Sequence, residues 1–298
     1  MKTDSIIFLK FIFILSILVS CQRSENSQTP NSHTGAFGQT VKPHNHEHID
    51  PRGQTLQTRF LPPEGFERVP SDQQSFAAYL RQLPLKPHGA EVRLYNGRTK
   101  PNDNVYDAVV DLKIGNKDLH QCADAIMRLR AEYLWRRKQY DKIHFNFTNG
   151  FRVDYSEWIQ GRRIVVNGNT ARWVPRAAPS NTYDDFWHYM EIIFSYAGTL
   201  SLSKELKPVP LDDIQIGDVF IHGGTPGHAV IVVDLAANPS TGKKRFLLAQ
   251  SYMPAQETQI LKNPNDSEIS PWYSIDFGDA LRTPEWTFDT SDLKRFEE

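Results

Sequence analysis

Two residues of this chain have the type and local setting expected of a nucleophile and its general base. Cys122 falls in the first turn of a predicted helix over residues 119–140. Backbone N–H groups and the helix dipole favour a thiolate there, and a lowered thiol pKa makes cysteine a nucleophile near neutral pH. Alternatively, Cys122 is a core residue, because Ala125, Ile126 and Leu129 recur on the same helical face.

His228 has the most distinctive setting among the ten histidines. It opens an apolar run directly after the glycine-rich sequence GGTPG at residues 223–227. The first residue of a strand beside such a loop can stay accessible while its neighbours are buried. We therefore predict that His228 is the general base. A histidine that only satisfies a loop carbonyl is the alternative.

A third polar residue should orient the imidazole. If the strand that begins at His228 and the strand that ends near Tyr252 form a hairpin, these two residues face each other and Gln250 lies diagonally on the same face. Gln250 is the predicted partner because its amide oxygen can accept from a ring N–H. A register shift by one residue would present Ser251 instead.

These residues predict acyl transfer. Cys122 would attack an amide carbonyl while His228 moves the proton, and Gln121 with backbone N–H groups at the helix start would stabilise the oxyanion. This chemistry requires no metal and no organic cofactor, and we predict neither. An acyltransferase uses the same pair of residues, so the sequence leaves hydrolysis and transfer open.

The elements that must position these residues follow from periodicity and turn residues. Asp118 is a predicted N-cap, and Gln121 three residues later completes a capping box before the long helix. We expect a short helix over 76–83, an aromatic-rich buried helix over 186–202, and strands over 106–114, 216–221, 228–235 and 245–252. Turn sequences at Asn96-Gly97, Asn149-Gly150 and Asn167-Gly168 predict further hairpins. The fold class is therefore α+β.

Residues 1–21 have the pattern of a secretory signal. Two lysines accompany an apolar run over residues 11–19, which is short for a membrane span. The run ends in LVSC at residues 18–21, which resembles the lipobox of bacterial lipoproteins. The resemblance implies cleavage before Cys21 and lipidation of that residue, so we expect a protein anchored in the cell envelope, at the outer membrane. An ordinary signal peptide with an incidental cysteine is the alternative.

The remaining chain divides into a tether and one domain. Residues 22–58 are rich in Ser, Asn, Thr, Gln, Pro and Gly and predict a disordered tether, and residues 59–298 predict a single α+β domain. The chain has two cysteines, so lipidation of Cys21 would leave Cys122 without an intramolecular partner. A formal net charge of -1 gives no electrostatic footprint for nucleic acid.

The order of these motifs resembles NlpC-type and CHAP-type papain-like amidases. A cysteine at a helix start is followed by IGDVF at 216–220, by Gly227-His228 opening a strand, and by a polar residue on the next strand. The resemblance implies a helix packed on an antiparallel sheet, an insertion around residues 145–205, and peptidoglycan stem peptides as the leading substrate. Gln121 and Ala123 flank Cys122, in place of the Asp-Cys-Ser pattern common in NlpC enzymes.

Most of the chain also resembles an uncharacterised family of bacterial lipoproteins. The resemblance is carried by QCADA at 121–125, GHAVIVVD at 227–234 and AQSYMP at 249–254. It implies no established activity. The rival hypothesis is therefore a non-catalytic envelope lipoprotein that binds a partner on the same scaffold. The membrane, reached through the anchor, and peptidoglycan or an envelope protein are the expected partners.

Overall fold

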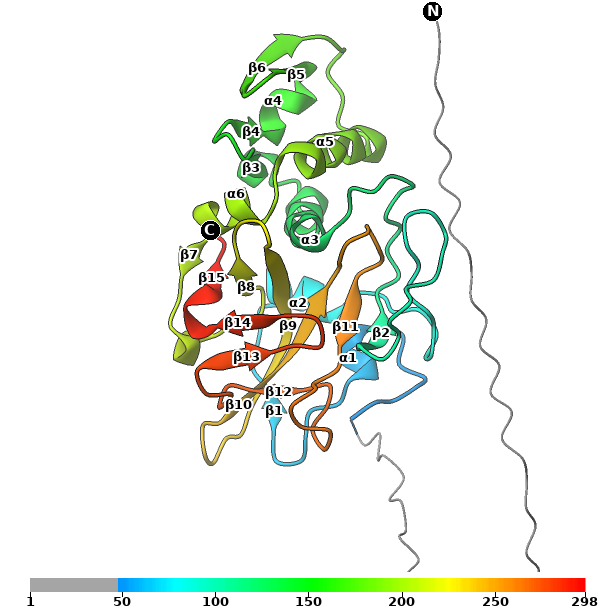
Figure 1. The fold of residues 1–298 in the computed structure, drawn as a ribbon, viewed down its shortest axis with the longest axis vertical. Coiled ribbons are helices and arrows are strands. Elements are labelled where there is room, and N and C mark those ends of the chain that lie inside the picture. The colour runs from blue at the N-terminus through cyan, green and yellow to red at the C-terminus, as the bar shows by residue number, and fades with distance from the viewer. Residues whose placement is uncertain (1–47, 298) are drawn as a thin grey trace, which may run out of the picture. The chain divides into compact units, whose positions relative to one another are not determined.

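The computed structural model describes residues 48–297 (Figure 1). This part of the chain is mixed α/β, with a mostly antiparallel central sheet and few helices. Its central sheet has nine strands within the described residues, in the order β2-β11-β10-β9-β8-β15-β7, with β1 paired to β9 and β12 paired to β10. These strands are β1 (Glu67–Arg68), β2 (Tyr106–Val109), β7 (Lys207–Pro208), β8 (Val219–His222), β9 (His228–Ala237), β10 (Lys244–Gln250), β11 (Gln259–Leu261), β12 (Tyr273–Ser274) and β15 (Leu293–Arg295).

Helices and three small hairpins surround this sheet. The helices are α1 (Leu56–Arg59), α2 (Phe76–Arg81), α3 (Cys122–Arg136), α4 (Tyr155–Ile159), α5 (Tyr183–Tyr196) and α6 (Thr199–Glu205), with 3-10 turns η1 (Tyr140–Lys142), η2 (Leu211–Asp213) and η3 (Thr290–Asp292). The hairpins pair β3 (His144–Asn146) with β4 (Arg152–Asp154), β5 (Arg162–Asn167) with β6 (Thr170–Pro175), and β13 (Ala280–Arg282) with β14 (Thr287–Asp289).

Strand β9 is the centre of the core and contributes to two apolar layers. Ala229 and Ile231 belong to the layer that contains the buried side chains of α3. Val230 and Val232 belong to a second layer, which contains side chains of β13 and β14. Side chains of a strand alternate between the faces of its sheet, and His228 therefore lies on the side of the β13–β14 hairpin. A strand that is buried on both faces has a continuous run of apolar residues in its sequence, and residues 229–233 form such a run.

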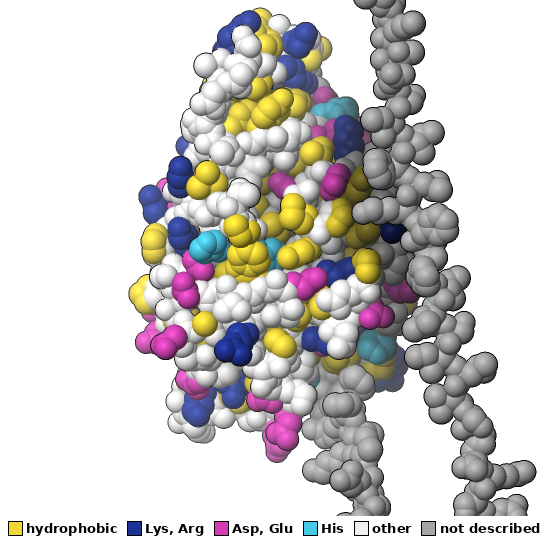
Figure 2. Space-filling view, in the orientation of Figure 1, with side chains coloured by type: hydrophobic (Ala, Val, Ile, Leu, Met, Phe, Trp, Pro, Cys, Tyr) yellow, Lys and Arg dark blue, Asp and Glu magenta, His cyan; other side chains and the backbone are white. Residues whose placement is uncertain are grey.

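The segment between α3 and α6 forms an additional layer over α3. Figure 1 shows α5 and the hairpins β3–β4 and β5–β6 beyond α3, away from the central sheet. The predicted turn at Asn149-Gly150 lies between β3 and β4, and the predicted turn at Asn167-Gly168 lies between β5 and β6. On the face drawn in Figure 2, Lys and Arg side chains are interspersed with Asp and Glu among the described residues.

Several predicted boundaries shift. Helix α3 begins at Cys122, not at Leu119, and its N-cap is Gln121, not Asp118. The Asp118 carboxylate does not cap the helix because it accepts from the backbone N–H of Ala255 at 2.6 Å. The Asp124 carboxylate instead accepts from the backbone N–H of Gln121, the N-cap residue, at 3.0 Å. The aromatic helix likewise splits into α5 and α6 at residues 197–198.

The folded domain begins before the predicted boundary at Arg59. Ile49 and Leu56 are buried, and Ile49 forms an antiparallel bridge with Phe60. Residues 48–58 of the predicted tether therefore belong to the packed domain, because these few apolar side chains suffice to anchor a polar segment. The predicted signal, the lipidation site Cys21 and the rest of the tether lie outside the described residues. Within residues 48–297, no helix is long and apolar enough to cross a bilayer.

A buried ion triad links β1 and α2 to the central strand β9. Asp234 of β9, which is fully buried, accepts from Arg68 Nε and from Arg81 Nε, both at 2.6 Å. Removing one member of a buried pair leaves an uncompensated charge, so Asp234→Asn is expected to lower the free energy of unfolding by about 3–5 kcal/mol. Urea denaturation measures this loss. Glu157→Gln, which breaks the surface pair with Arg162, should leave the midpoint almost unchanged.

Candidate functional site

A cavity of about 650 Å³ opens where the start of α3 meets the start of β9. Cys122 and His228 both line it. The other walls come from the loop before α6, the loop after β10 and Trp286, which precedes β14. The structure therefore brings together the two residues that the sequence singled out, although they lie on different elements.

The glycine-rich loop before β9 is shaped by close packing against α6. A Cβ atom on Gly227 would lie 2.4 Å from Thr199 Oγ1, which is shorter than any real contact of a Cβ atom. Only glycine permits this approach. The loop thereby places His228, the first residue of β9, at the wall of the cavity.

Cys122 occupies the first residue of α3 and is partly buried. Burial raises the pKa of its thiol to about 11, and the nearby Asp124 carboxyl adds to the rise, against hydrogen bonds from the backbone N–H groups of Ala123 and Ala229. This differs from the thiolate expected at a helix start, because desolvation of the charged form outweighs the backbone contacts. Ala229, whose backbone N–H acts on the thiol, is the residue that follows His228.

The imidazole of His228 is nearly fully buried, at 1% exposure, so the expectation of an accessible ring is wrong. Aromatic rings enclose it, with centroid distances of 4.9 Å to Tyr252, 5.5 Å to Trp286 and 5.9 Å to Phe288. Burial lowers the pKa of His228 to about 4, and the Lys100 charge lowers it further, against a hydrogen bond with Gln250. At neutral pH the imidazole is therefore uncharged and can accept a proton.

The pairing of β9 with β10 places Gln250 beside the imidazole of His228. A bulge between Leu247 and Leu248 sets the register in which Ala249 pairs with Ile231. Gln250 Oε1 then lies 2.8 Å from His228 Nε2, so the predicted contact is present. The alternative register is not adopted.

Ser251, the residue that the alternative register would have presented, points elsewhere. Its hydroxyl lies 2.9 Å from the backbone oxygen of His120 and 2.7 Å from that of Gln256, and its side chain is fully buried. It is therefore committed to backbone acceptors and does not orient the imidazole.

Gln121, the predicted oxyanion residue, lines the cavity as the N-cap of α3. Its side-chain Nε2 donates to Asp118 Oδ1 at 3.2 Å. The side-chain amide thus already donates to Asp118, and the backbone N–H groups of the first turn are the other candidate donors to an oxyanion.

Two charged residues behind the histidine were missed by the sequence reasoning. Gln250 Nε2 donates to Glu285 Oε2 at 2.6 Å, and Lys100 Nζ lies 2.8 and 2.9 Å from the two oxygens of the same carboxylate. Lys100 also donates to Gln256 Oε1 at 3.0 Å. Neither charged residue lies in a motif: Glu285 belongs to a Pro- and Trp-rich segment that has no clear periodicity, and Lys100 to a loop after a turn. No sequence signal marked them.

A comparison with protein families identifies the domain to which this site belongs. The chain matches the model of a family described as domain of unknown function (4846), over residues 56–295. The chain belongs to this family. No curated protein and no solved structure matches it. The match extends from α1 into β15, so the family domain contains every residue of the site described above.

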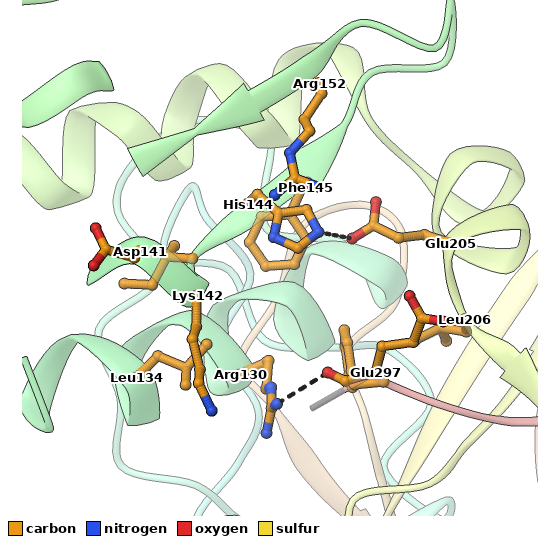
Figure 3. A pocket seen from close by; sticks show the side chains of 12 residues that line it. Arg130, Leu134, Asp141, Lys142, His144, Phe145, Arg152, Glu205, Leu206 and Glu297 are labelled. Atoms are coloured by element: carbon orange, nitrogen blue, oxygen red, sulfur yellow. Dashed lines mark hydrogen bonds and ion pairs between the residues drawn. The ribbon is translucent and has the colours of Figure 1, made fainter. Parts of the chain in front are cut away.

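A second cavity of the family domain, of about 260 Å³, lies along α3 away from Cys122 (Figure 3). Its lining residues include no Cys, Ser or Thr that could act as a nucleophile. His144 Nε2 lies 3.9 Å from Glu205 Oε1 there, and Figure 3 shows these two side chains pointing toward each other. In neither cavity, nor elsewhere in residues 48–297, do three or more His, Cys, Asp or Glu side chains form a group that could hold a metal.

Glu205, which lines this second cavity, makes the stability of the folded protein depend on pH. Burial raises the pKa of its carboxyl from 4.5 to about 7, against a hydrogen bond from the backbone N–H of Asn146. The folded state therefore binds more protons than the unfolded state between these values, and stability falls as the pH rises from about 4.5 to 7. Glu205→Gln keeps the acceptor and removes the charge, so its melting temperature should exceed that of the wild type at pH 8 and approach it at pH 4.5. An equal difference at both pH values would contradict this assignment.

Proposed function

We propose that this protein is a cysteine hydrolase of amide bonds with a papain-like arrangement of its reacting groups. The observation that supports it best is one cavity lined by a helix-borne thiol and a strand-borne imidazole, with an amide oxygen 2.8 Å from the imidazole. The antiparallel sheet with α3 packed on it is the layer arrangement that the resemblance to NlpC-type and CHAP-type amidases implies. Geometry and roles, not sequence position, identify such a constellation.

The chemistry follows from the protonation states. Uncharged His228 takes the proton of the Cys122 thiol as sulfur attacks the substrate carbonyl, so the S–C bond forms in the same step in which S–H breaks. Backbone N–H groups at the start of α3 stabilise the resulting oxyanion. The imidazolium then gives its proton to the leaving amine, and the C–N bond breaks. Water, deprotonated by His228, hydrolyses the thioester and regenerates the thiol.

Peptidoglycan stem peptides are the proposed substrate class. This choice rests on the resemblance to peptidoglycan amidases and on the lipobox-like end of the predicted signal, and it is an analogy at the level of the fold. The test is digestion of purified muropeptides by the full chain, with mass spectrometry of the products. A new amine terminus and a matching new carboxylate support the proposal. Intact muropeptides together with an unmodified Cys122 would contradict it.

We propose that this activity is located in the cell envelope, at the outer membrane, where lipidated Cys21 anchors the chain. Cys21→Ser is expected to abolish incorporation of labelled acyl lipid and to release the protein from the membrane fraction, because an acylated cysteine holds the chain there. Labelling with a lipid precursor followed by membrane flotation measures both effects. Unchanged acyl incorporation in this variant would overturn the lipoprotein assignment.

A non-catalytic binding protein is the second candidate. The raised thiol pKa and the nearly complete burial of His228 favour it, because a core cysteine and a satisfied histidine have the same properties. This candidate predicts that Cys122→Ala retains every function of the wild type. The hydrolase predicts a complete loss of cleavage in a variant that still folds.

A further inference from the structure

Glu285 is separated from His228 by only two hydrogen bonds, both through the side chain of Gln250. We propose that Glu285 is a positioning residue that selects the tautomer of His228 through the amide of Gln250. The catalytic meaning of this tautomer rests on the proposed function, whereas the tautomer itself is a property of the folded protein.

Glu285 is the one side chain in this series of contacts that accepts hydrogen bonds and cannot donate any. Both oxygens of Glu285 lie within 3.0 Å of the Lys100 ammonium, at 2.9 and 2.8 Å, and Lys100 is only 4% exposed. A carboxylate paired in this way with a buried ammonium is ionised and accepts hydrogen bonds only. Lys100 also donates to Gln256 Oε1, which holds the ammonium in place.

This carboxylate determines which end of the Gln250 amide faces it. The amide atom 2.6 Å from Glu285 Oε2 must be a donor, because the carboxylate has no proton to give. It is therefore the NH₂ group, and the carbonyl oxygen is the end that faces the imidazole at 2.8 Å. The orientation of an amide is otherwise undetermined by its shape, since its oxygen and nitrogen are nearly isosteric.

The amide orientation in turn determines the imidazole. A carbonyl oxygen only accepts, so the ring nitrogen facing Gln250 must carry the proton. His228 is then the Nε2–H tautomer when neutral, and Nδ1 is the nitrogen left to take a proton from a thiol. Without the Glu285 carboxylate the amide can turn by half a rotation, present NH₂ to Nε2, and favour the Nδ1–H tautomer, which cannot act as a base at Nδ1.

The test compares the tautomer of His228 with turnover in the same variants. Nitrogen-15 NMR of the labelled full chain at pH 7 should show His228 as Nε2–H in the wild type. Glu285→Gln is expected to shift this signal toward Nδ1–H and to lower kcat about 10²-fold, with KM changed little, because a wrong tautomer removes general-base catalysis. An unchanged Nε2–H signal in Glu285→Gln would overturn the proposal.

Two further variants separate positioning from a merely structural role. Glu257→Gln is the matched control, because Glu257 is also a buried carboxylate paired with a lysine, Lys86 at 2.5 Å, but accepts from Lys86 and the backbone N–H of Arg93 in place of Gln250. It should leave the tautomer and kcat unchanged. The swapped pair, Gln250→Glu together with Glu285→Gln, places the acceptor-only group against the ring and should restore the Nε2–H tautomer. It should also move the acid limb of the pH profile upward, because an adjacent carboxylate favours the imidazolium.

These readouts distinguish the proposal from the proposed function. If Glu285→Gln changes the tautomer while the wild type cleaves no muropeptide, the positioning role stands and the hydrolase assignment fails. If the wild type cleaves and Glu285→Gln retains both tautomer and kcat, the hydrolase stands and the positioning role fails. Failure of the swapped pair to restore Nε2–H in a folded protein would also overturn the positioning role.

Discussion

Cys122→Ala is expected to abolish muropeptide cleavage, and His228→Ala to lower kcat/KM by about 10²–10⁴-fold, the usual contribution of a general base. Cys122 is the only cysteine among the described residues that line the cavity, and the threonine hydroxyls there are far weaker nucleophiles than a thiol. In His228→Ala, water can still accept the proton of the thiol, slowly, so residual activity should rise with pH. The measurement is the initial rate of product formation, followed by mass spectrometry over at least three decades of enzyme concentration.

The fold must be shown to survive these substitutions. Cys122 lies at the first residue of a helix and is only partly buried, so alanine should be tolerated there. His228 packs between Tyr252 and Phe288, and its loss leaves a gap. His228→Gln is therefore the matched variant, because it fills most of this space without an imidazole. Wild-type cleavage rates in a folded Cys122→Ala protein would overturn the role of Cys122 as the nucleophile.

We expect kcat/KM to fall with decreasing pH below about pH 4 and to be constant above it. Burial lowers the pKa of His228 to about 4, and only the uncharged imidazole can take the thiol proton. The rate should fall about tenfold for each pH unit below this value. Because burial raises the pKa of Cys122 to about 11, no thiolate limb should interrupt the plateau between pH 5 and 9.

Alkylation of Cys122 by iodoacetamide tests the same protonation states without a substrate. In the full chain with Cys21→Ser, Cys122 is the sole thiol, and its alkylation should accelerate steadily up to about pH 11. A preformed thiolate–imidazolium pair would instead give a rate independent of pH from about pH 5 to 8, and this outcome would contradict the neutral pair. The lowered pKa of His228 also makes folding less favourable as the pH falls from 6.5 to 4, so circular dichroism must accompany each acid point.

Local features of the sequence were sufficient for the elements that carry the site. The glycine-rich loop followed by a continuous apolar run predicts a strand beginning at His228, and β9 begins there. The good helix formers after Gln121 predict α3, although its start moved by three residues because Asp118 bonds to a distant backbone N–H. Period-2 alternation and the hairpin geometry brought Gln250 to the imidazole, since cross-strand neighbours are set by a nearby turn.

Protonation states and the outer members of the site depended on the tertiary structure. A helix start favours a thiolate, but the direction of the pKa shift of Cys122 is decided by desolvation, which comes from residues distant in sequence. Glu285 and Lys100 meet behind Gln250 only because a loop and the β13–β14 segment pack against the same end of the sheet. The sequence by itself therefore determined which residues could react and which strands hold them. Only the packed fold decided how deeply they are buried, and burial sets the charge that each one carries.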